Sequence, residues 1–152
     1  VKDSLGIKPV MSAGLSLGEY TALVESGSLD FETALKLVRK RGKLMQEAVP
    51  QGVGAMTAVM GMDRETIQSI CEEASSVAGV YPANYNMPGQ IVIGGYKEGV
   101  VKAEELLAEA GAKRLIPLKV SGPFHTPLLK EASESLRTES FGRDLRFDTI
   151  HV

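Results

Sequence analysis

Gly14-Leu15-Ser16-Leu17-Gly18-Glu19 is the stretch that decides the fold. It is a G-x-S-x-G element between a segment suited to a β-strand and a segment suited to a helix. In that setting it predicts a nucleophile elbow, a sharp strand-to-helix turn that exposes a serine hydroxyl. Residues 8–13 supply the expected strand and residues 19–25 the expected helix, which ends at Gly27. We expect both glycines of the element to be needed, because a side chain at either would crowd the turn. Such an elbow indicates acyl transfer through Ser16.

The composition indicates a soluble globular protein with a real core, since 43% of the 152 residues are hydrophobic and 24% are charged. A net charge of -2 argues against nucleic-acid binding. Cys71 is the only cysteine, which excludes an internal disulfide and predicts a small core residue. No stretch is long and apolar enough to span a membrane, and residues 1–3 do not open a signal peptide. We therefore expect a cytoplasmic protein.

Regular alternation of helix and strand signals follows the elbow. Asp30 is the expected N-cap of a long amphipathic helix that continues to Val49 and is stopped by Pro50. Beyond it, strands are expected at 55–60, 80–85, 90–94 and 113–120, and helices at 63–74 and 97–110. Residues 86–89 are the expected connection between the second and third strands.

The β-α-β-β-α-β order over 54–120 is the ferredoxin-like arrangement, which can close as its own small domain. The only other strand candidates, 9–13 and 147–152, are too few for a sheet around the elbow, because parallel α/β sheets need neighbours on both sides. The sequence thus predicts an α/β protein in three parts. These are part of an α/β core at 1–52, a ferredoxin-like small subdomain at 53–120, and an incomplete return to the core at 121–152.

His125 is the stronger candidate for the base that a serine nucleophile needs, because it lies in a loop just beyond a predicted strand. The other histidine, His151, lies in an apolar stretch, where a structural role is expected. A plain hydrogen bond in a turn is the alternative for His125. No acidic residue stands out as the third member of a triad.

Arg41 is a candidate binding residue because of helical geometry. At 3.6 residues per turn it falls in the middle of an apolar stripe made by residues 34, 38, 45 and 48. A cation there is costly unless it is paired, and a guanidinium suits bidentate pairing with a carboxylate. Two partners remain open, the internal acid Glu19 and a carboxylate on the substrate. The positions expected to point outward are those of Arg39, Lys40 and Lys43.

Leu17 and Asn86 complete the candidate site. The backbone N–H of Leu17 follows the nucleophile and is expected to point at the developing oxyanion. No second oxyanion donor is evident. Three further polar residues either line the site or shape the hairpin, namely Asn84, Asn86 and Gln90. When Asn86 is considered by itself, a role in the turn is the stronger interpretation.

Four blocks of sequence, in this order, closely resemble the malonyl-CoA:acyl carrier protein transacylases. These acyltransferases load malonyl units in fatty-acid synthesis and are related to polyketide acyltransferase domains. The blocks are residues 14–20, 41–46, 84–90 and 121–125, and they span almost the whole chain. The resemblance implies an α/β-hydrolase-like core with an inserted ferredoxin-like subdomain, present here as an internal fragment.

By that resemblance, Ser16 takes the malonyl group from CoA as an ester, His125 acts as general base and then as acid, and Arg41 binds the free carboxylate. The phosphopantetheine thiol of acyl carrier protein then removes the acyl group, without a cofactor or metal. Phe124, directly before His125, resembles the bulky residue of a malonyl-type pocket. A bulky side chain there disfavours a branched acyl group by about 1 to 3 kcal/mol.

The resemblance also implies a cytoplasmic, monomeric parent enzyme whose partners are malonyl-CoA and acyl carrier protein. Neither nucleic acid nor a membrane is implied. In that family main-chain carbonyl groups orient the histidine, which agrees with the missing third acid.

Two departures from the family stand out. Leu15 occupies the place where the family usually has histidine, and we expect this change to be tolerated. The family's N-terminal block, with a glutamine of the oxyanion hole, and the C-terminal region that orients the histidine have no counterpart here. Loss of one oxyanion donor lowers the rate by about 100- to 1000-fold. We therefore expect a correctly shaped nucleophile in an incomplete active site.

Two other functions remain open from the sequence. One is a serine hydrolase with the same elbow. The other is a noncatalytic module that binds an acidic carrier protein through Lys113, Arg114 and Lys119, although these charges also suit a plain solvated surface.

Overall fold

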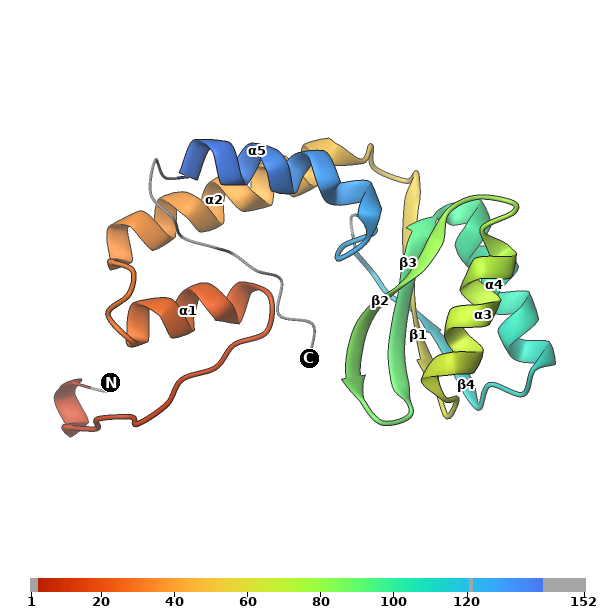
Figure 1. Cartoon of the computed structure of the whole chain (residues 1–152), viewed down its shortest axis with the longest axis horizontal. Coiled ribbons are helices and arrows are strands. Elements are labelled where there is room, and N and C mark those ends of the chain that lie inside the picture. Colours follow the sequence, from red (N-terminus) through yellow and green to blue (C-terminus); the bar gives the residue numbers. More distant parts are fainter. Residues whose placement is uncertain (1–2, 121, 141–152) are drawn as a thin grey trace. The chain divides into compact units, whose positions relative to one another are not determined.

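The structure, a computed structural model, describes residues 3–120 and 122–140. The chain divides into two compact units at Gly42 and Lys43, each of which is described here by itself. Helices and a small antiparallel sheet make up the fold (Figure 1), so the expected mixed α/β class is confirmed. None of the described helices is long and apolar enough to cross a membrane.

Helices are the only regular elements among the described residues of the first unit. It contains a short 3-10 helix η1 (Asp3–Leu5), helix α1 (Leu17–Glu25) and most of helix α2 (Phe31–Ala48). The strand expected at 8–13 is wrong, because these residues have no regular structure and are exposed, Val10 by 95%. A strand is stable only when a neighbour satisfies its backbone groups, and no described residue of this unit forms a strand.

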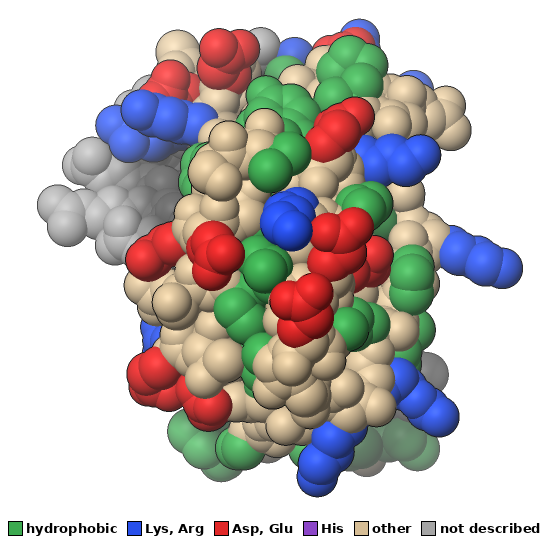
Figure 2. All heavy atoms as spheres, turned by 90° about the vertical axis from the view of Figure 1, so that its right-hand side faces the viewer, with side chains coloured by type: hydrophobic (Ala, Val, Ile, Leu, Met, Phe, Trp, Pro, Cys, Tyr) green, Lys and Arg blue, Asp and Glu red, His purple; other side chains and the backbone are tan. Residues whose placement is uncertain are grey.

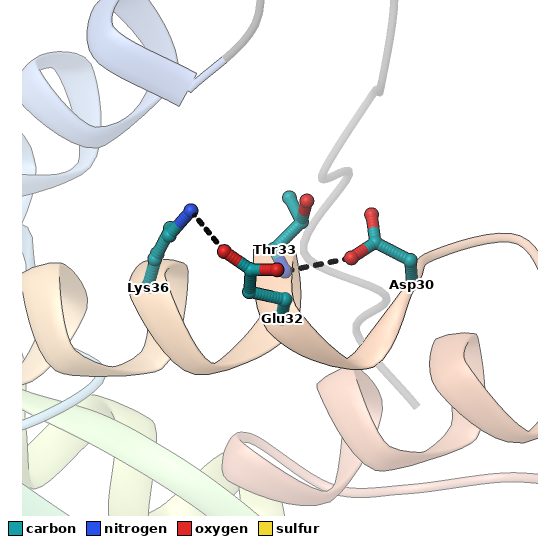
Figure 3. Close-up of polar contacts among 4 residues, drawn as sticks. All are labelled: Asp30, Glu32, Thr33 and Lys36. Carbon is teal, nitrogen blue, oxygen red and sulfur yellow. Dashed lines mark hydrogen bonds and ion pairs between the residues drawn. The ribbon is translucent and has the colours of Figure 1, made fainter.

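The ends of the first two helices follow the sequence signals. Gly27 has a φ of 76°, the left-handed conformation expected just after a helix. Asp30 Oδ1 accepts a hydrogen bond from the Thr33 amide over 2.9 Å, so the expected N-cap is confirmed (Figure 3). One turn along, Lys36 donates to Glu32 over 2.7 Å on the exposed side of α2.

The second unit contains a four-stranded sheet with all pairs antiparallel and the strand order β2-β3-β1-β4. The β-α-β-β-α-β order expected for this part of the chain is observed. The strands are β1 (Gly54–Met60), β2 (Val80–Met87), β3 (Gln90–Tyr96) and β4 (Arg114–Pro117). The helices are α3 (Arg64–Ala74), α4 (Lys97–Glu109), the short η2 (Pro127–Leu129) and α5 (Lys130–Ser140).

Helices α3 and α4 cover one face of this sheet (Figure 1). Large apolar side chains from both layers are fully buried between them, among them Val59, Ile67, Ile93 and Leu107. One polar pair lies in the same layer, where the buried Thr57 hydroxyl donates to Glu104 Oε1 over 2.6 Å. Burial of apolar surface on this face, together with a satisfied polar pair, gives the sheet a rigid backing.

The bounds of all four strands differ from the sequence expectation, and the ends of β2 and β4 have clear local reasons. β2 continues to Met87, so Asn86 belongs to the strand and not to the connection, where only Pro88 and Gly89 form the turn. Asn86 is an extra residue between two register positions, which makes it part of a β-bulge. β4 ends at Pro117 instead of continuing to residue 120, as expected where proline removes a ladder donor. The strand expected at 147–152 lies outside the described residues.

Cys71 is 2% exposed on α3, as the sequence predicts for a core residue. Burial raises the pKa of its thiol from the usual 9.0 to about 12, since the thiolate would lose its hydration. The unfolded chain therefore releases this proton at a lower pH than the folded chain does.

We expect Cys71 to make the free energy of unfolding fall as pH rises from 9.0 toward about 12. The fall should approach about 1.4 kcal/mol per pH unit, and this contribution is fully present below pH 9.0. Urea denaturation at several pH values measures it. A Cys71→Ala variant is the control, and an equal slope in both proteins would contradict the prediction.

Candidate functional site

Ser16 lies at the sharp turn that opens α1. Its backbone has φ 54° and ψ −108°, a conformation that residues with a β-carbon rarely adopt. The turn is closed by hydrogen bonds from the Gly18 amide to the Leu15 carbonyl (2.9 Å) and from the Glu19 amide to the Ser16 carbonyl (3.2 Å). This is the local geometry that the motif predicts, although the strand before it is not formed.

The two glycines of the motif have different environments. A β-carbon on Gly14 would overlap the carbonyl group of Gly18, so only glycine fits there. A β-carbon on Gly18 would meet nothing within 4 Å. The expectation that both glycines are needed is therefore wrong for Gly18, because its missing side chain would project from α1 into open space.

Arg41 reaches the elbow from α2. Its Nη2 donates a hydrogen bond to Ser16 Oγ over 2.7 Å. The guanidinium carbon lies 5.9 Å from the centroid of the Tyr20 ring, within cation–π range. Among the described residues Arg41 makes no ion pair with Glu19, so the first of its two expected partners is not observed.

Tyr20, which Arg41 contacts through its ring, is only 7% exposed. Burial raises the pKa of the Tyr20 phenol, while the positive charge of Arg41 acts in the opposite direction. Arg41 itself is half-buried on the side of α2 that carries the buried Ala34 and Leu37. The outward orientation is confirmed for the exposed Arg39 and Lys43, whereas Lys40 is half-buried.

His125 lies in a loop of the second unit, and it also has a positive φ, 60°. The residues on both sides of it are anchored. Thr126 is buried, and its hydroxyl donates to the Pro123 carbonyl over 2.7 Å. Pro123 is fully buried against Gly54 at the start of β1, where a β-carbon would overlap the proline ring. The exposed His125 is thus held between two buried neighbours.

The face of the sheet opposite α3 and α4 supports the same loop. Phe124 packs there against a small buried cluster of Met56, Ala58 and Val92. The Thr126 methyl group approaches Gly94, where a β-carbon would lie 3.3 Å from it. The small sheet therefore carries the helices on one face and the His125 loop on the other.

The remaining site candidates are less closely connected. Leu17 is the first residue of α1, so its amide is among those that have no partner within the helix. Asn86 is exposed near the hairpin end of β2, whereas the His125 loop packs at Gly54 and Gly94, toward the other end of the sheet. His151 lies outside the described residues. A shallow depression of about 410 Å³ beside α4 contains none of the candidates.

The sequence gives no signal for the anchors of the His125 loop. Gly54, Gly94 and Thr126 are unremarkable in the sequence, and only the close approach of the loop to the sheet gives them a role. No group of three or more His, Cys, Asp or Glu side chains within 3–120 and 122–140 is arranged to hold a metal ion.

A serine held at positive φ at the start of a helix is the local geometry found in nucleophile-elbow proteins. Comparison with known proteins identifies the family. The acyl transferase domain family matches residues 2–149, and the chain belongs to this family.

Relatives and solved structures agree with this assignment. The malonyl CoA-acyl carrier protein transacylase of Escherichia coli K12 is 52% identical over 134 residues, which cover 88% of this chain and 43% of that protein. The crystal structure of an acyl-carrier-protein S-malonyltransferase from Burkholderia pseudomallei matches with a TM-score of 0.85 and 51% identity, over 90% of this chain and 45% of that one.

A third match is a malonyl-transacylase solved in complex with its type II PKS acyl-carrier protein. It has a TM-score of 0.83 and 51% identity, and the match covers 86% of this chain and 42% of that one. The chain thus spans less than half the length of these relatives.

Alanine at the two motif glycines should have opposite effects. Gly14→Ala should lower the free energy of unfolding by about 1–3 kcal/mol, because the new methyl group overlaps the Gly18 backbone. Gly18→Ala should leave it unchanged or raise it by up to about 1 kcal/mol, since alanine favours the helix. Urea denaturation followed by circular dichroism compares them, and equal losses would show that the turn does not need its close approach.

A second pair of glycines tests the support of the His125 loop. Gly54→Ala should displace Pro123 and so change the NMR chemical shift of the His125 ring. Gly122→Ala is the matched control in the same loop, because its β-carbon would meet only the Phe124 ring at 3.6 Å, an ordinary contact. A His125 signal that is unchanged in Gly54→Ala would refute the anchoring.

Proposed function

We propose that this chain is part of a malonyl-CoA:acyl carrier protein transacylase of fatty-acid biosynthesis, with Ser16 as nucleophile and His125 as general base. One observation carries the proposal. Among the described residues, Ser16 and His125 are the only two other than glycine with positive φ. Such strain costs about 1–3 kcal/mol per residue and is concentrated at functional sites. Two residues chosen from the sequence for their chemistry are also the two that the fold strains.

The proposed reaction has two acyl transfers. In the first, His125 takes the Ser16 proton while Oγ attacks the thioester carbonyl of malonyl-CoA, and the C–S bond breaks as the proton passes to the CoA sulfur. In the second, His125 takes the proton of the phosphopantetheine thiol, the sulfur attacks the malonyl ester, and the ester C–O bond breaks as the proton returns to Ser16 Oγ. The Leu17 amide is the proposed oxyanion donor, since it lies just after the nucleophile at a helix start. No step needs a cofactor.

Arg41 and Phe124 are the proposed residues of acyl-group selection. Arg41 donates a hydrogen bond to the Ser16 hydroxyl. From this position the guanidinium can reach the malonyl carboxylate, which lies two bonds beyond the reacting carbonyl. Phe124 directly precedes His125 and is partly buried on the sheet, so its ring is a fixed wall. Asn86 is proposed as a further substrate contact only from the family resemblance.

The charge of the second unit bears on how it would meet an acidic carrier protein. α3 and α4 together carry seven glutamates and only three basic residues. Figure 2 shows several of these acidic side chains across the helical face. We propose docking away from this face, on the side of the edge strand β4, where the basic side chains are exposed. They are Lys113, Arg114 and Lys119.

We also propose that the chain is divided between a small subdomain and part of a larger core. Residues 53–120 would form a ferredoxin-like subdomain, because the sheet has the corresponding strand order and two helices on one face. Residues 1–52 and 121–152 would belong to an α/β-hydrolase-like core. The parent enzyme is proposed to be a cytoplasmic monomer.

Serine hydrolysis is the second candidate, because the elbow would serve water as well as a thiol as acceptor. Arg41 favours transfer of a carboxylated acyl group, since a hydrolase of neutral esters has no use for a half-buried cation at its nucleophile. The third candidate is a noncatalytic fragment that only binds the carrier protein.

Intact mass spectrometry after mixing the chain with malonyl-CoA tests the proposal. We expect a malonyl adduct on Ser16 that a holo acyl carrier protein removes. Ser16→Ala should form none, and His125→Ala should form it at least about 100-fold more slowly, because a general base contributes that much.

A chimera provides the second measurement. The aligned part of this chain, 88% of its length, replaces the matching 134 residues of the Escherichia coli transacylase, and malonyl transfer to the carrier protein is assayed. Transfer that depends on Ser16 supports the proposal. Loss of the thioester to water at the same rate with and without carrier protein would favour the hydrolase, and carrier binding without any adduct would favour the noncatalytic fragment.

A further inference from the structure

The contact between Arg41 and Ser16 has a second meaning for catalysis. Nη2 of Arg41 donates to Oγ of Ser16 over 2.7 Å, so the guanidinium engages the oxygen that would act as nucleophile. We propose that Arg41 restrains Ser16 until the carboxylate of the acyl donor takes over the guanidinium. This inference rests on the proposed function, in which Arg41 binds that carboxylate.

The restraint follows from the electrons of Oγ. The attack on a thioester carbonyl uses a lone pair of this oxygen, and a hydrogen bond from a charged N–H engages a lone pair and fixes the side chain. A carboxylate is a stronger acceptor than a hydroxyl and can accept two parallel N–H donors from guanidinium. A malonyl donor therefore draws Arg41 away from Ser16, whereas an acetyl donor leaves the contact in place.

Tyr20 keeps the guanidinium within reach of both acceptors. Its buried ring lies 5.9 Å from the Arg41 guanidinium carbon and belongs to α1, the helix that begins just after Ser16. The guanidinium is thus held near the elbow while it changes acceptor. Selection of a carboxylated acyl group then acts on the reactivity of the nucleophile as well as on binding.

The opposite effect is the physical rival of this inference. A cation beside Oγ also stabilises the alkoxide, which would make Arg41 an activator of Ser16. The two effects predict rate changes of opposite sign when Arg41 is removed or occupied.

The restraint and the activation of Ser16 can be distinguished by supplying the thioester and the carboxylate as two separate molecules. Acetyl-CoA supplies the thioester, and formate supplies the carboxylate in trans without being consumed. In the acylation, the bond from Ser16 Oγ to the acetyl carbon forms, the C–S bond breaks, and the proton passes through His125 to the CoA sulfur. We expect formate to accelerate acetylation of Ser16 roughly tenfold over chloride at equal ionic strength, the value of one charge-assisted hydrogen bond.

Arg41→Ala should accept acetyl from acetyl-CoA roughly tenfold faster than the unsubstituted chain and should not respond to formate. Arg39→Ala is the matched control, because it removes one positive charge from an exposed position of α2. It should behave like the unsubstituted chain, and circular dichroism compares the helix content of both variants.

Each result separates the inference from the proposed function. Normal malonyl labelling of Ser16 together with no formate effect, or with slower acetylation in Arg41→Ala, overturns the restraint and leaves the transacylase proposal intact. Absence of any malonyl adduct on Ser16, in the chain and in the chimera, overturns both. The formate experiment uses the unsubstituted chain, so it does not depend on how the variants fold.

Discussion

Backbone strain at two residues is the constraint on which the two candidate site segments depend. Ser16 and His125 both have positive φ, although both carry β-carbons. A conformation of this kind persists only when its surroundings impose it. At Ser16 the surroundings are the turn that Gly14 closes against Gly18, and at His125 they are the buried neighbours Pro123 and Thr126. Both arrangements present a polar side chain from a backbone that cannot relax.

The small sheet explains how the second of these arrangements is maintained. Its helical face is filled with apolar side chains and gives the strands a rigid position. Its other face receives the His125 loop at points where β-carbons are missing, so the loop can approach the strand backbone closely. Helix packing on one side and loop placement on the other are therefore coupled through the same strands.

Local signals were enough for much of the fold. The Asp30 cap, the end of α1 near Gly27 and the order of strands and helices from β1 to β4 were all predicted, because caps, turns and apolar periodicity act over a few residues. Two predictions that depended on distant neighbours were wrong. The strand at 8–13 had the right composition, but residues 3–120 and 122–140 provide no partner strand for it. Asn86 was predicted in the turn, but the register of β2 and β3 places it in a bulge.

The sequence by itself determined the chemistry available to this protein. It indicated a serine in an elbow, a histidine in a loop and an arginine in an apolar stripe, because residue type and spacing carry that information. Only the tertiary structure decided which residues contact one another. It paired Arg41 with the Ser16 hydroxyl in place of Glu19, required glycine at residue 14 but not at residue 18, and seated the His125 loop on Gly54. These outcomes depend on close approaches between segments distant in sequence, which no local pattern encodes.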